Sequence, residues 1–303
     1  MLQNEKILLT GPNGQVAFPL ARALAAHKDV TGLARFGKPE DRERVEALGV
    51  RCVAADMATD DFADLPDDFT LVLNFAVVKT GDFDHDLAAN AEGLGRLMSR
   101  CRGARALLHC SSGGVYAPPG RTPALETDPL GDNHRAMMPT YSLCKIAAES
   151  MARFAAREWN VPTTIARFSV PYGDNGGWPW YHLVMMKQGV PIPVHTDAPS
   201  VFNPIHEDDY IVQVPRMLEI ASVPATVVNW GGDEAVSIEE WCAYIGELTG
   251  LEAKFNPTEA TVASLPLDLT RMRELVGPAG VHWRDGIRRM IEARNPELLP
   301  SRS

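Results

Sequence analysis

The chain has 303 residues, 45% of them hydrophobic and 22% charged, a composition typical of a globular enzyme and not of a disordered or fibrous chain. Its 29 Lys and Arg residues against 39 Asp and Glu residues leave a formal net charge of −10, which argues against nucleic acid as a partner. No targeting pattern opens the sequence and no apolar run approaches the roughly 18 residues that cross a bilayer, so we expect a cytoplasmic protein without membrane contacts.

The five cysteines are widely spaced and form no Cys-x-x-Cys pair. This spacing indicates reduced thiols and offers no framework for zinc. We therefore predict no metal site.

Short apolar strands alternate with longer helical patterns through the first half of the chain. Strands separated by helices in this rhythm form a parallel sheet covered on both faces. The predicted fold class is α/β, a Rossmann-like doubly wound parallel sheet with a smaller C-terminal substrate-binding lobe. The predicted strands cover 6–10, 30–34, 51–54, 71–74, 106–110 and 163–168, and the predicted helices 16–25, 39–48, 90–101 and 141–159.

After residue 168 the rhythm breaks, because prolines and glycines interrupt the pattern too often for further strand–helix units. We predict a dinucleotide-binding domain over 1–170, with a return segment near 201–230. A smaller substrate-binding lobe covers 171–200 and 231–303, with a frayed tail from about Asn295. Aromatic and methionine side chains gather in this region and form either the core of the lobe or a substrate pocket: Tyr172, Trp178, Trp180, Tyr181, Met185 and Met186.

A glycine-rich turn, running from Thr10 to Ala17, follows the first predicted strand. Glycines let the backbone turn tightly and approach a pyrophosphate, whose charge is stabilised at the N-terminus of the following helix. An ordinary strand-to-helix turn can have the same letters, so the motif gains its meaning from the strand before it and the helix after it. The predicted cofactor-binding residues of the turn are Gly11, Asn13, Gly14, Gln15 and Val16.

Tyr141 and Lys145 stand four residues apart on a predicted helix, so they project from one face about one turn apart. A nearby ammonium favours the phenolate, and Lys145 is expected to lower the pKa of Tyr141 from its free value of about 10. Such a tyrosine can transfer the proton when an alcohol and a carbonyl interconvert. Ser112, in the pair Ser111-Ser112, adds a hydroxyl that can polarise the carbonyl. Taken alone, a Tyr-x-x-x-Lys pair is more often an exposed pair of helix residues.

The motifs occur in the order Gly-x-x-Gly-x-x-Ala, Ser111-Ser112-Gly113-Gly114-Val115-Tyr116 and Tyr-x-x-x-Lys. In this order the chain resembles the extended short-chain dehydrogenase/reductase superfamily and, within it, the NAD-dependent epimerase/dehydratase family. The resemblance extends from Lys6 to about Arg294. It implies a nicotinamide cofactor, a small-molecule substrate and a homodimer whose two helices per subunit pack as a four-helix bundle.

The resemblance also implies roles for single residues. Ser112 aligns with the hydroxyl that holds the substrate oxygen, Tyr141 with the proton-transferring phenol, and Lys145 with the lysine that also binds the nicotinamide ribose. These three are the predicted catalytic residues, and Asn90 is expected either to be structural or to support the residues that contact the ligands. The remaining cofactor positions are Asp56 and Met57 at the adenine, Phe75, Ala76 and Lys79 after the fourth strand, and Phe168 and Val170 at the nicotinamide.

The second predicted strand departs from the family pattern at its end, where Leu33-Ala34-Arg35 stands. Family members that prefer NAD usually place an acid there for the ribose 2′-hydroxyl, whereas an arginine suits a 2′-phosphate. The cofactor is therefore NADP or NAD, and the sequence favours NADP. If Arg35 instead stacks on the adenine or simply lies in solvent, the choice between NADP and NAD stays open.

A second departure concerns the substrate. Nucleotide-sugar epimerases that the chain resembles bind the sugar diphosphate with an asparagine and an arginine, at the positions of Val170 and Phe202 in this sequence. A diphosphate without cationic partners is costly to bury. With Trp178, Trp180 and Tyr181 nearby, an uncharged or aromatic-compatible substrate fits better.

Two histidines, His134 and His182, are candidates for the lining of a pocket, although a lone histidine more often packs or lies at the surface. Our first hypothesis is an NAD(P)-dependent oxidoreductase that interconverts an alcohol and a carbonyl on a small, non-nucleotide substrate. The alternative is a nucleotide-sugar epimerase with retained NAD. A dehydratase is less favoured, because Gly113 and Gly114 replace the acidic pair of such enzymes. A non-catalytic dinucleotide-sensing protein is a third, remote hypothesis, since sensors commonly lose the tyrosine or the lysine.

Overall fold

The structure, a computed structural model, describes residues 4–27 and 29–300. Within these residues a seven-stranded parallel sheet runs in the order β12-β6-β5-β4-β1-β2-β3. The strand order reverses between β1 and β4, as in doubly wound folds. The strands are β1 (Ile7–Thr10), β2 (Val30–Ala34), β3 (Arg51–Ala54), β4 (Leu71–Asn74), β5 (Ala106–Ser112), β6 (Thr163–Phe168) and β12 (Thr226–Trp230).

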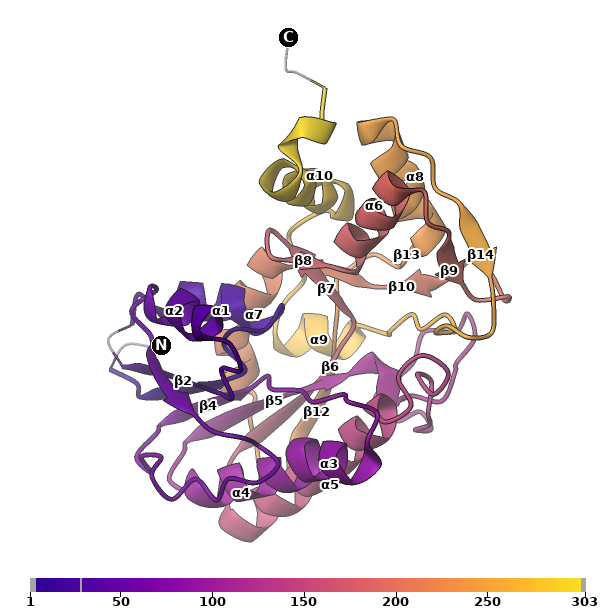
Figure 1. Ribbon diagram of the computed structural model, residues 1–303. Helices are drawn as coiled ribbons and strands as arrows, with labels where there is room; N and C mark the ends of the chain where they lie inside the picture. The colour runs from indigo at the N-terminus through magenta and orange to yellow at the C-terminus, as the bar shows by residue number, and fades with distance from the viewer. Residues whose placement is uncertain (1–3, 28, 301–303) are drawn as a thin grey trace.

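Helices cover both faces of this sheet (Figure 1). One face is covered by α1 (Ala17–Leu24), α2 (Pro39–Glu46) and α7 (Glu207–Glu219), and the other by α3 (Phe83–Leu87), α4 (Gly93–Arg100) and α5 (Tyr141–Trp159). A π-helical turn, η1 (Ala88–Glu92), joins α3 to α4. The alternation of side chains along β1 shows why both faces need cover, since Ile7 and Leu9 belong to one apolar cluster and Leu8 to the other.

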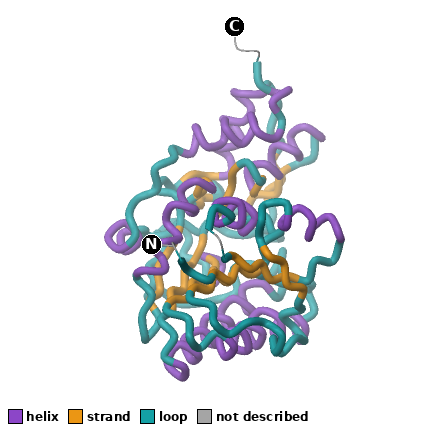
Figure 2. Tube along the Cα trace, turned by 90° about the vertical axis from the view of Figure 1, so that its left-hand side faces the viewer, coloured by secondary structure: helices purple, strands orange, loops and turns teal. Residues whose placement is uncertain are grey.

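The remaining elements gather mainly beyond the carboxyl edge of the sheet, and the described chain ends there, far from α4 and α5 (Figure 1). Figure 2 shows the same division from the side, with strands in the middle, a helical layer below and further helices above. These elements are β7 (Val170–Gly173), β8 (Gly176–Gly177), α6 (Trp178–Gln188), β9 (Ile192–Val194), β10 (Val201–Phe202), β11 (Pro204–His206), β13 (Val236–Ser237), α8 (Ile238–Thr249), β14 (Phe255–Pro257), α9 (Thr270–Leu275), α10 (Trp283–Arg294) and the short turns η2 (Gly113–Val115) and η3 (Pro296–Leu298).

The predicted fold class is confirmed, and several predicted elements match residue for residue, among them 30–34, 71–74 and 141–159. The predicted helix 90–101 begins earlier, because Asp82 accepts a hydrogen bond from the His85 N–H (3.0 Å) and so caps a helical start at Phe83. Strand β5 extends to Ser112, two residues beyond its predicted end. The domain boundaries remain a prediction.

The frayed tail predicted from Asn295 is wrong for residues 295–300, while 301–303 lie outside the described residues. Residues Pro296–Leu298 form a helical turn, and the indole N–H of Trp180 donates to Asn295 Oδ1 (3.2 Å). Leu298 and Leu299 pack against the main apolar cluster. This apolar contact holds the segment against the rest of the protein. None of the described helices combines the length and the apolar character needed to span a membrane.

Candidate active site

A cavity of about 480 Å³ opens at the carboxyl edge of the sheet, beside the strands where the order reverses. Crevices at this edge are where doubly wound sheets bind ligands. The cavity is lined by residues of the glycine-rich turn, the ends of β4, β5 and β6, the segment before α5, and α6: Gly11, Gly14, Gln15, Val16, Ala17, Phe75, Val77, Lys79, Ser112, Gly113, Gly114, His134, Met137, Met138, Tyr141, Phe168, Ser169, Val170, Pro171, Gly177, Trp178, Tyr181, Phe202 and Leu265.

The glycine-rich turn forms one side of the cavity, and its first glycine is required by the backbone. Gly11 has φ +67°, and a Cβ there would lie 3.1 Å from the Cα of Ala76. Thr10 holds this approach, because its hydroxyl accepts hydrogen bonds from the N–H groups of Phe75 (3.0 Å) and Ala76 (2.9 Å). No side chain caps the N-terminus of α1, so its backbone N–H groups point toward the turn without a side-chain acceptor. This arrangement suits a pyrophosphate.

Ser112 and Tyr141 come from different elements and meet at the cavity. Ser112 ends β5, and Tyr141 begins α5. The Gly114 N–H donates to Ser112 Oγ (3.0 Å), which fixes the hydroxyl at the start of a tight turn. A hydrogen bond between the Tyr141 and Ser112 side chains works to lower the pKa of Tyr141. The predicted catalytic serine and tyrosine are therefore neighbours in space, although 28 positions separate them.

Lys145 does not lower the pKa of Tyr141 as the sequence led us to expect. Burial of the phenol dominates and raises the pKa of Tyr141 to about 12. The lysine is 5% exposed, and its Nζ donates to the carbonyl oxygen of Cys110 (2.7 Å), behind the residues that line the cavity. Its own pKa is lowered, since burial penalises the ammonium. Tyr141 therefore begins as a neutral phenol, able to donate its proton.

A buried ion pair holds β5, α5 and β6 together under the site. Arg167 and Glu149 are both 2% exposed in their side chains and lie 2.8 Å apart, and Ser111 donates to the same carboxylate (2.7 Å). Arg167 also donates to the backbone oxygen of Glu126 (3.0 Å), which ties down the long segment before Tyr141. This network positions the strand end that carries Ser112, because Ser111 is its neighbour.

Asn90 binds the backbone between β4 and α3. Its amide donates to Val78 O (2.7 Å) and accepts from the Val78 N–H (2.9 Å), so it holds the segment between β4 and α3. Lys79 follows directly and lines the cavity, with Nζ near Met138 Sδ (3.8 Å). Among the lining residues that the structure describes, Lys79 is the one lysine or arginine.

The part of the lining contributed by elements outside the central sheet is apolar and aromatic. Trp178 and Phe202 pack edge to face with ring centroids 5.2 Å apart. Tyr181 is half exposed at the rim, and buried Leu265 comes from far along the chain. The aromatic cluster that the sequence assigned either to a lobe core or to a pocket is thus divided, with Trp178 and Tyr181 at the cavity and the other four members outside its lining.

The two candidate histidines also have different surroundings. His134 lines the cavity, with its ring centroid 5.0 Å from that of Tyr141. His182 is buried away from the lining, where its Nδ1 accepts a hydrogen bond from the Trp241 indole N–H (2.9 Å). Burial lowers the pKa of each histidine to about 4. Both imidazoles are therefore neutral at pH 7.

Several predicted cofactor residues lie outside the cavity lining: Asn13, Arg35, Asp56, Met57, Ala76 and Lys145. Arg35 is exposed just beyond β2, and Asp56 and Met57 follow β3, so these three lie along the same edge of the sheet. Asp56 accepts from the Ala58 N–H (2.9 Å), and Met57 O accepts from Arg96 (2.8 Å). Their roles at the adenosine end of a dinucleotide stay a prediction.

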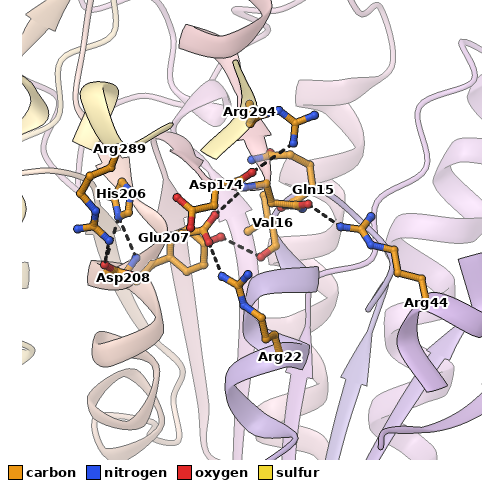
Figure 3. A network of polar contacts seen from close by, with 12 residues as sticks. Gln15, Val16, Arg22, Arg44, Asp174, His206, Glu207, Asp208, Arg289 and Arg294 are labelled. Carbon is orange, nitrogen blue, oxygen red and sulfur yellow. Dashed lines mark hydrogen bonds and ion pairs between the residues drawn. The ribbon is translucent and has the colours of Figure 1, made fainter. Parts of the chain in front are cut away.

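A polar network joins the glycine-rich turn to the region beyond the sheet (Figure 3). Buried Glu207, at the start of α7, pairs with Arg22 (2.7 Å) and accepts from the Asn175 N–H (3.0 Å). The Asn175 amide in turn donates to Gln15 O (2.7 Å) and accepts from Arg44 (2.8 Å). This network fixes the turn against β7 and α7, and sequence reasoning missed it because its members are spread over the whole chain.

The sequence also gave no sign of four lining residues: Val77, Met137, Met138 and Leu265. Single apolar residues in loops carry no motif, so only the tertiary structure brings them to the cavity. Among the described residues no group of three or more His, Cys, Asp or Glu side chains is arranged to hold a metal ion.

The family model described as NAD dependent epimerase/dehydratase matches residues 7–219, which is more than half of the chain. The protein therefore belongs to this family and is an enzyme of the extended short-chain dehydrogenase/reductase type, as its motifs indicated. No curated protein sequence gives a significant match.

Solved structures with the same fold include nucleotide-sugar enzymes. UDP-glucuronic acid 4-epimerase from Bacillus cereus, in complex with UDP-glucuronic acid and NAD, is 20% identical, with a TM-score of 0.81 and coverage of 95% of this chain and 98% of that one. MoeE5 in complex with UDP-glucose and NAD is 22% identical, with a TM-score of 0.81 and coverage of 97% and 99%. DesIV, a dTDP-glucose 4,6-dehydratase from Streptomyces venezuelae, is 20% identical, with a TM-score of 0.81 and coverage of 96% and 97%. At these identities the likeness establishes the fold.

Proposed function

We propose that this enzyme interconverts an alcohol and a carbonyl on a small substrate, with a nicotinamide dinucleotide as the redox partner. The observation that carries the proposal is one shared cavity, lined both by the glycine-rich turn and by Ser112 and Tyr141. A dinucleotide on the turn would bring its nicotinamide toward Phe168 and Val170, which line the same cavity.

The chain's own residues would hold the reacting oxygen and move its proton. Ser112 Oγ binds the substrate oxygen and stabilises charge that develops there. Tyr141 donates its proton to that oxygen in the reducing direction and accepts it in the oxidising direction. Lys145 is buried behind the lining, where its Nζ donates to the Cys110 carbonyl oxygen, and it would orient the nicotinamide ribose. The bound nicotinamide supplies or takes up the hydride.

The substrate we propose is uncharged and not a nucleotide. The wall formed by Trp178, Tyr181, Phe202 and Leu265 offers apolar surface, and Lys79 is the one described lysine or arginine on the lining. The positions where related epimerases bind a diphosphate carry Val170 and Phe202 in this chain. A diphosphate in this cavity would lack most of its charged partners.

The alternative substrate is a nucleotide sugar, with NAD retained and an epimerase activity. The solved structures support this alternative better than they support a non-nucleotide substrate, since they name UDP- and dTDP-sugar enzymes with bound NAD. They support NAD as the dinucleotide as well, whereas NADP rests on Arg35 alone.

A homodimer in the cytoplasm remains part of the proposal. Helix α5 presents Leu143 and Phe154 to solvent, and Phe154 is 56% exposed. Exposed apolar side chains on a long helix suit a helix-packed interface with a second copy.

One experiment separates the candidate substrates. The purified protein is analysed for bound dinucleotide and then incubated with UDP-glucuronic acid or UDP-glucose, and separately with cyclic alcohols plus NAD or NADP. Reduction of added dinucleotide by an alcohol supports the dehydrogenase. Conversion of a UDP-sugar to its epimer by protein that retains NAD supports the alternative. The absence of both activities contradicts the proposal, and Tyr141→Phe serves as the control for contaminating enzymes.

A further inference from the structure

His134 occupies the place of a side chain that the neighbouring residue lacks. A Cβ built on Gly114 would lie 2.1 Å from His134 Cε1 and 2.4 Å from Nδ1, far inside van der Waals contact. The imidazole therefore fills the volume that any side chain at position 114 would occupy. Residue 114 follows Ser112 by two positions, so the ring lies beside the reacting groups.

The hydrogen bonds around His134 determine which ring nitrogen carries the proton. Ser142 Oγ lies 2.7 Å from Gly114 O and donates its one proton there. The same Oγ lies 3.2 Å from His134 Nδ1 and 3.3 Å from the His134 N–H, so it acts as acceptor toward both. Nδ1 accordingly carries the hydrogen, and Nε2 carries the lone pair.

Nε2 is then a hydrogen-bond acceptor available to a ligand. Among the described residues, the hydrogen bonds assigned to a ring nitrogen of His134 run through Nδ1, and none is assigned to Nε2. Burial lowers the pKa of His134 to about 4, with a smaller effect of Lys79 in the same direction and an opposing one from a hydrogen bond to the Gly114 backbone, so the ring stays neutral at pH 7. A neutral imidazole with so low a pKa is a weak base, which favours binding over proton abstraction.

We propose that His134 is a specificity-determining residue whose Nε2 accepts a hydrogen bond from a second hydroxyl of the substrate, next to the one that reacts at Ser112 and Tyr141. The substrate class is thus a ring that bears adjacent hydroxyls, packed on Trp178 and Phe202. This inference rests on the proposed function and applies equally to an apolar cyclic diol and to a sugar ring.

The proposal explains why this site combines an apolar wall with a fixed acceptor. Apolar contact alone discriminates weakly between a ring and its hydroxylated analogue, whereas a fixed acceptor that pairs with a substrate hydroxyl adds discrimination. Ser142 and Gly114 hold the acceptor in place, since both are buried and both contact His134.

The first arm of the test measures binding in the intact protein. Histidine is labelled with ¹⁵N, the reduced dinucleotide is added so that no oxidation occurs, and cis- or trans-1,2-cyclohexanediol is titrated against cyclohexanol as control. His134→Gln identifies the His134 resonance by its loss. We expect the unprotonated Nε2 signal to move to lower ¹⁵N frequency with a diol and not with cyclohexanol. No response to either diol overturns the proposal.

The second arm compares kcat/KM for the diol with that for cyclohexanol in each variant. His134→Phe fills the space and removes the acceptor, and it should reduce this ratio by about 10-fold or more. His134→Gln keeps an acceptor near the Nε2 position and should restore most of the ratio. An equal loss of kcat/KM for the diol and for cyclohexanol would mark His134 as a packing residue and overturn the proposal.

The two arms separate the inference from the proposed function. If the Nε2 signal responds to a diol but the wild-type enzyme oxidises neither probe, the proposed function fails for these substrates and the binding role of His134 stands. If an alcohol is oxidised but the Nε2 signal never responds, the proposed function stands and His134 has no such role.

Discussion

The two walls of the cavity differ in where their residues come from and in what they can do. The wall at the sheet edge is built from Gly11, Ser112 and Tyr141, at the ends of strands and the start of a helix. The apolar wall is built from Trp178, Phe202 and Leu265, which come from the start of α6, the short strand β10 and a loop, all outside the central sheet. On the proposed function, the central sheet and the start of α5 position the polar groups, and elements outside the sheet supply the apolar surface for the substrate.

The largest expected effect tests whether the sheet-edge wall holds the chemistry. Tyr141→Phe removes the proton-transferring hydroxyl and should lower kcat by about 10²- to 10⁴-fold, because general acid–base catalysis contributes that much. The matched variant on the other wall, Tyr181→Phe, should change KM more than kcat. Steady-state kinetics measures kcat and KM of both variants, with whichever substrate is turned over in the assays described under Proposed function. Equal effects on kcat would remove the distinction between the walls.

The next prediction concerns the ion pair that supports the sheet-edge wall. Arg167→Met removes the buried partner of the Glu149 carboxylate and leaves it with the Ser111 hydroxyl and the more distant, partly exposed Arg153 (4.0 Å), so it should lower the free energy of unfolding by about 3–5 kcal/mol. The exposed ion pair between Arg42 and Glu46 is the control. Arg42→Ala should change the free energy of unfolding by less than about 1 kcal/mol. Urea denaturation measures the difference. A small effect for Arg167→Met would mean that water or another cation compensates Glu149.

The region beyond the sheet should respond to acid through His182. The pKa of His182 is about 4 in the folded chain, below the ordinary 6.5, because burial and the Trp241 hydrogen bond favour the neutral ring. Its contribution to stability is complete above pH 6.5 and is lost as pH falls toward 4, since the unfolded chain binds the proton first. The expected slope is roughly 1 kcal/mol per pH unit.

The variant His182→Asn isolates this contribution from that of the carboxylates. Asparagine retains an acceptor for Trp241 but cannot be protonated, so the variant should lose less stability than the wild type between pH 6.5 and 4. Thermal unfolding at several pH values measures both slopes. Equal slopes of stability against pH in the wild type and in His182→Asn would show that His182 does not govern the loss of stability in acid.

The smallest expected effect lies at the outer end of the dinucleotide edge. Arg35→Ala should weaken NADP binding by about 10-fold, the loss of one charged hydrogen bond to a phosphate, and should leave NAD binding within a few-fold. Calorimetric titration with both dinucleotides measures the two affinities. An equal loss for both would place Arg35 on the adenine instead of the 2′-phosphate.

Sequence reasoning was most accurate where a regular pattern carries the information. The helix 141–159 and the strand 71–74 were predicted to the residue. The helix has a long apolar repeat, and all four residues of the strand are buried. It was wrong about the pKa of Tyr141, since a spacing of four residues predicts proximity to Lys145 but not the burial that outweighs it. It also missed the start at Phe83, where Asp82 supplies a cap.

By itself, the sequence determined the fold class and the family, and it led us to propose Ser112, Tyr141 and Lys145 as catalytic residues, since each depends on local spacing along the chain. Only the tertiary structure decided what surrounds them: the apolar wall with Leu265, the imidazole of His134 in the space beside Gly114, and the network through Asn175 and Glu207. These contacts join residues tens to hundreds of positions apart. Their geometry depends on how the elements pack, which no short motif encodes.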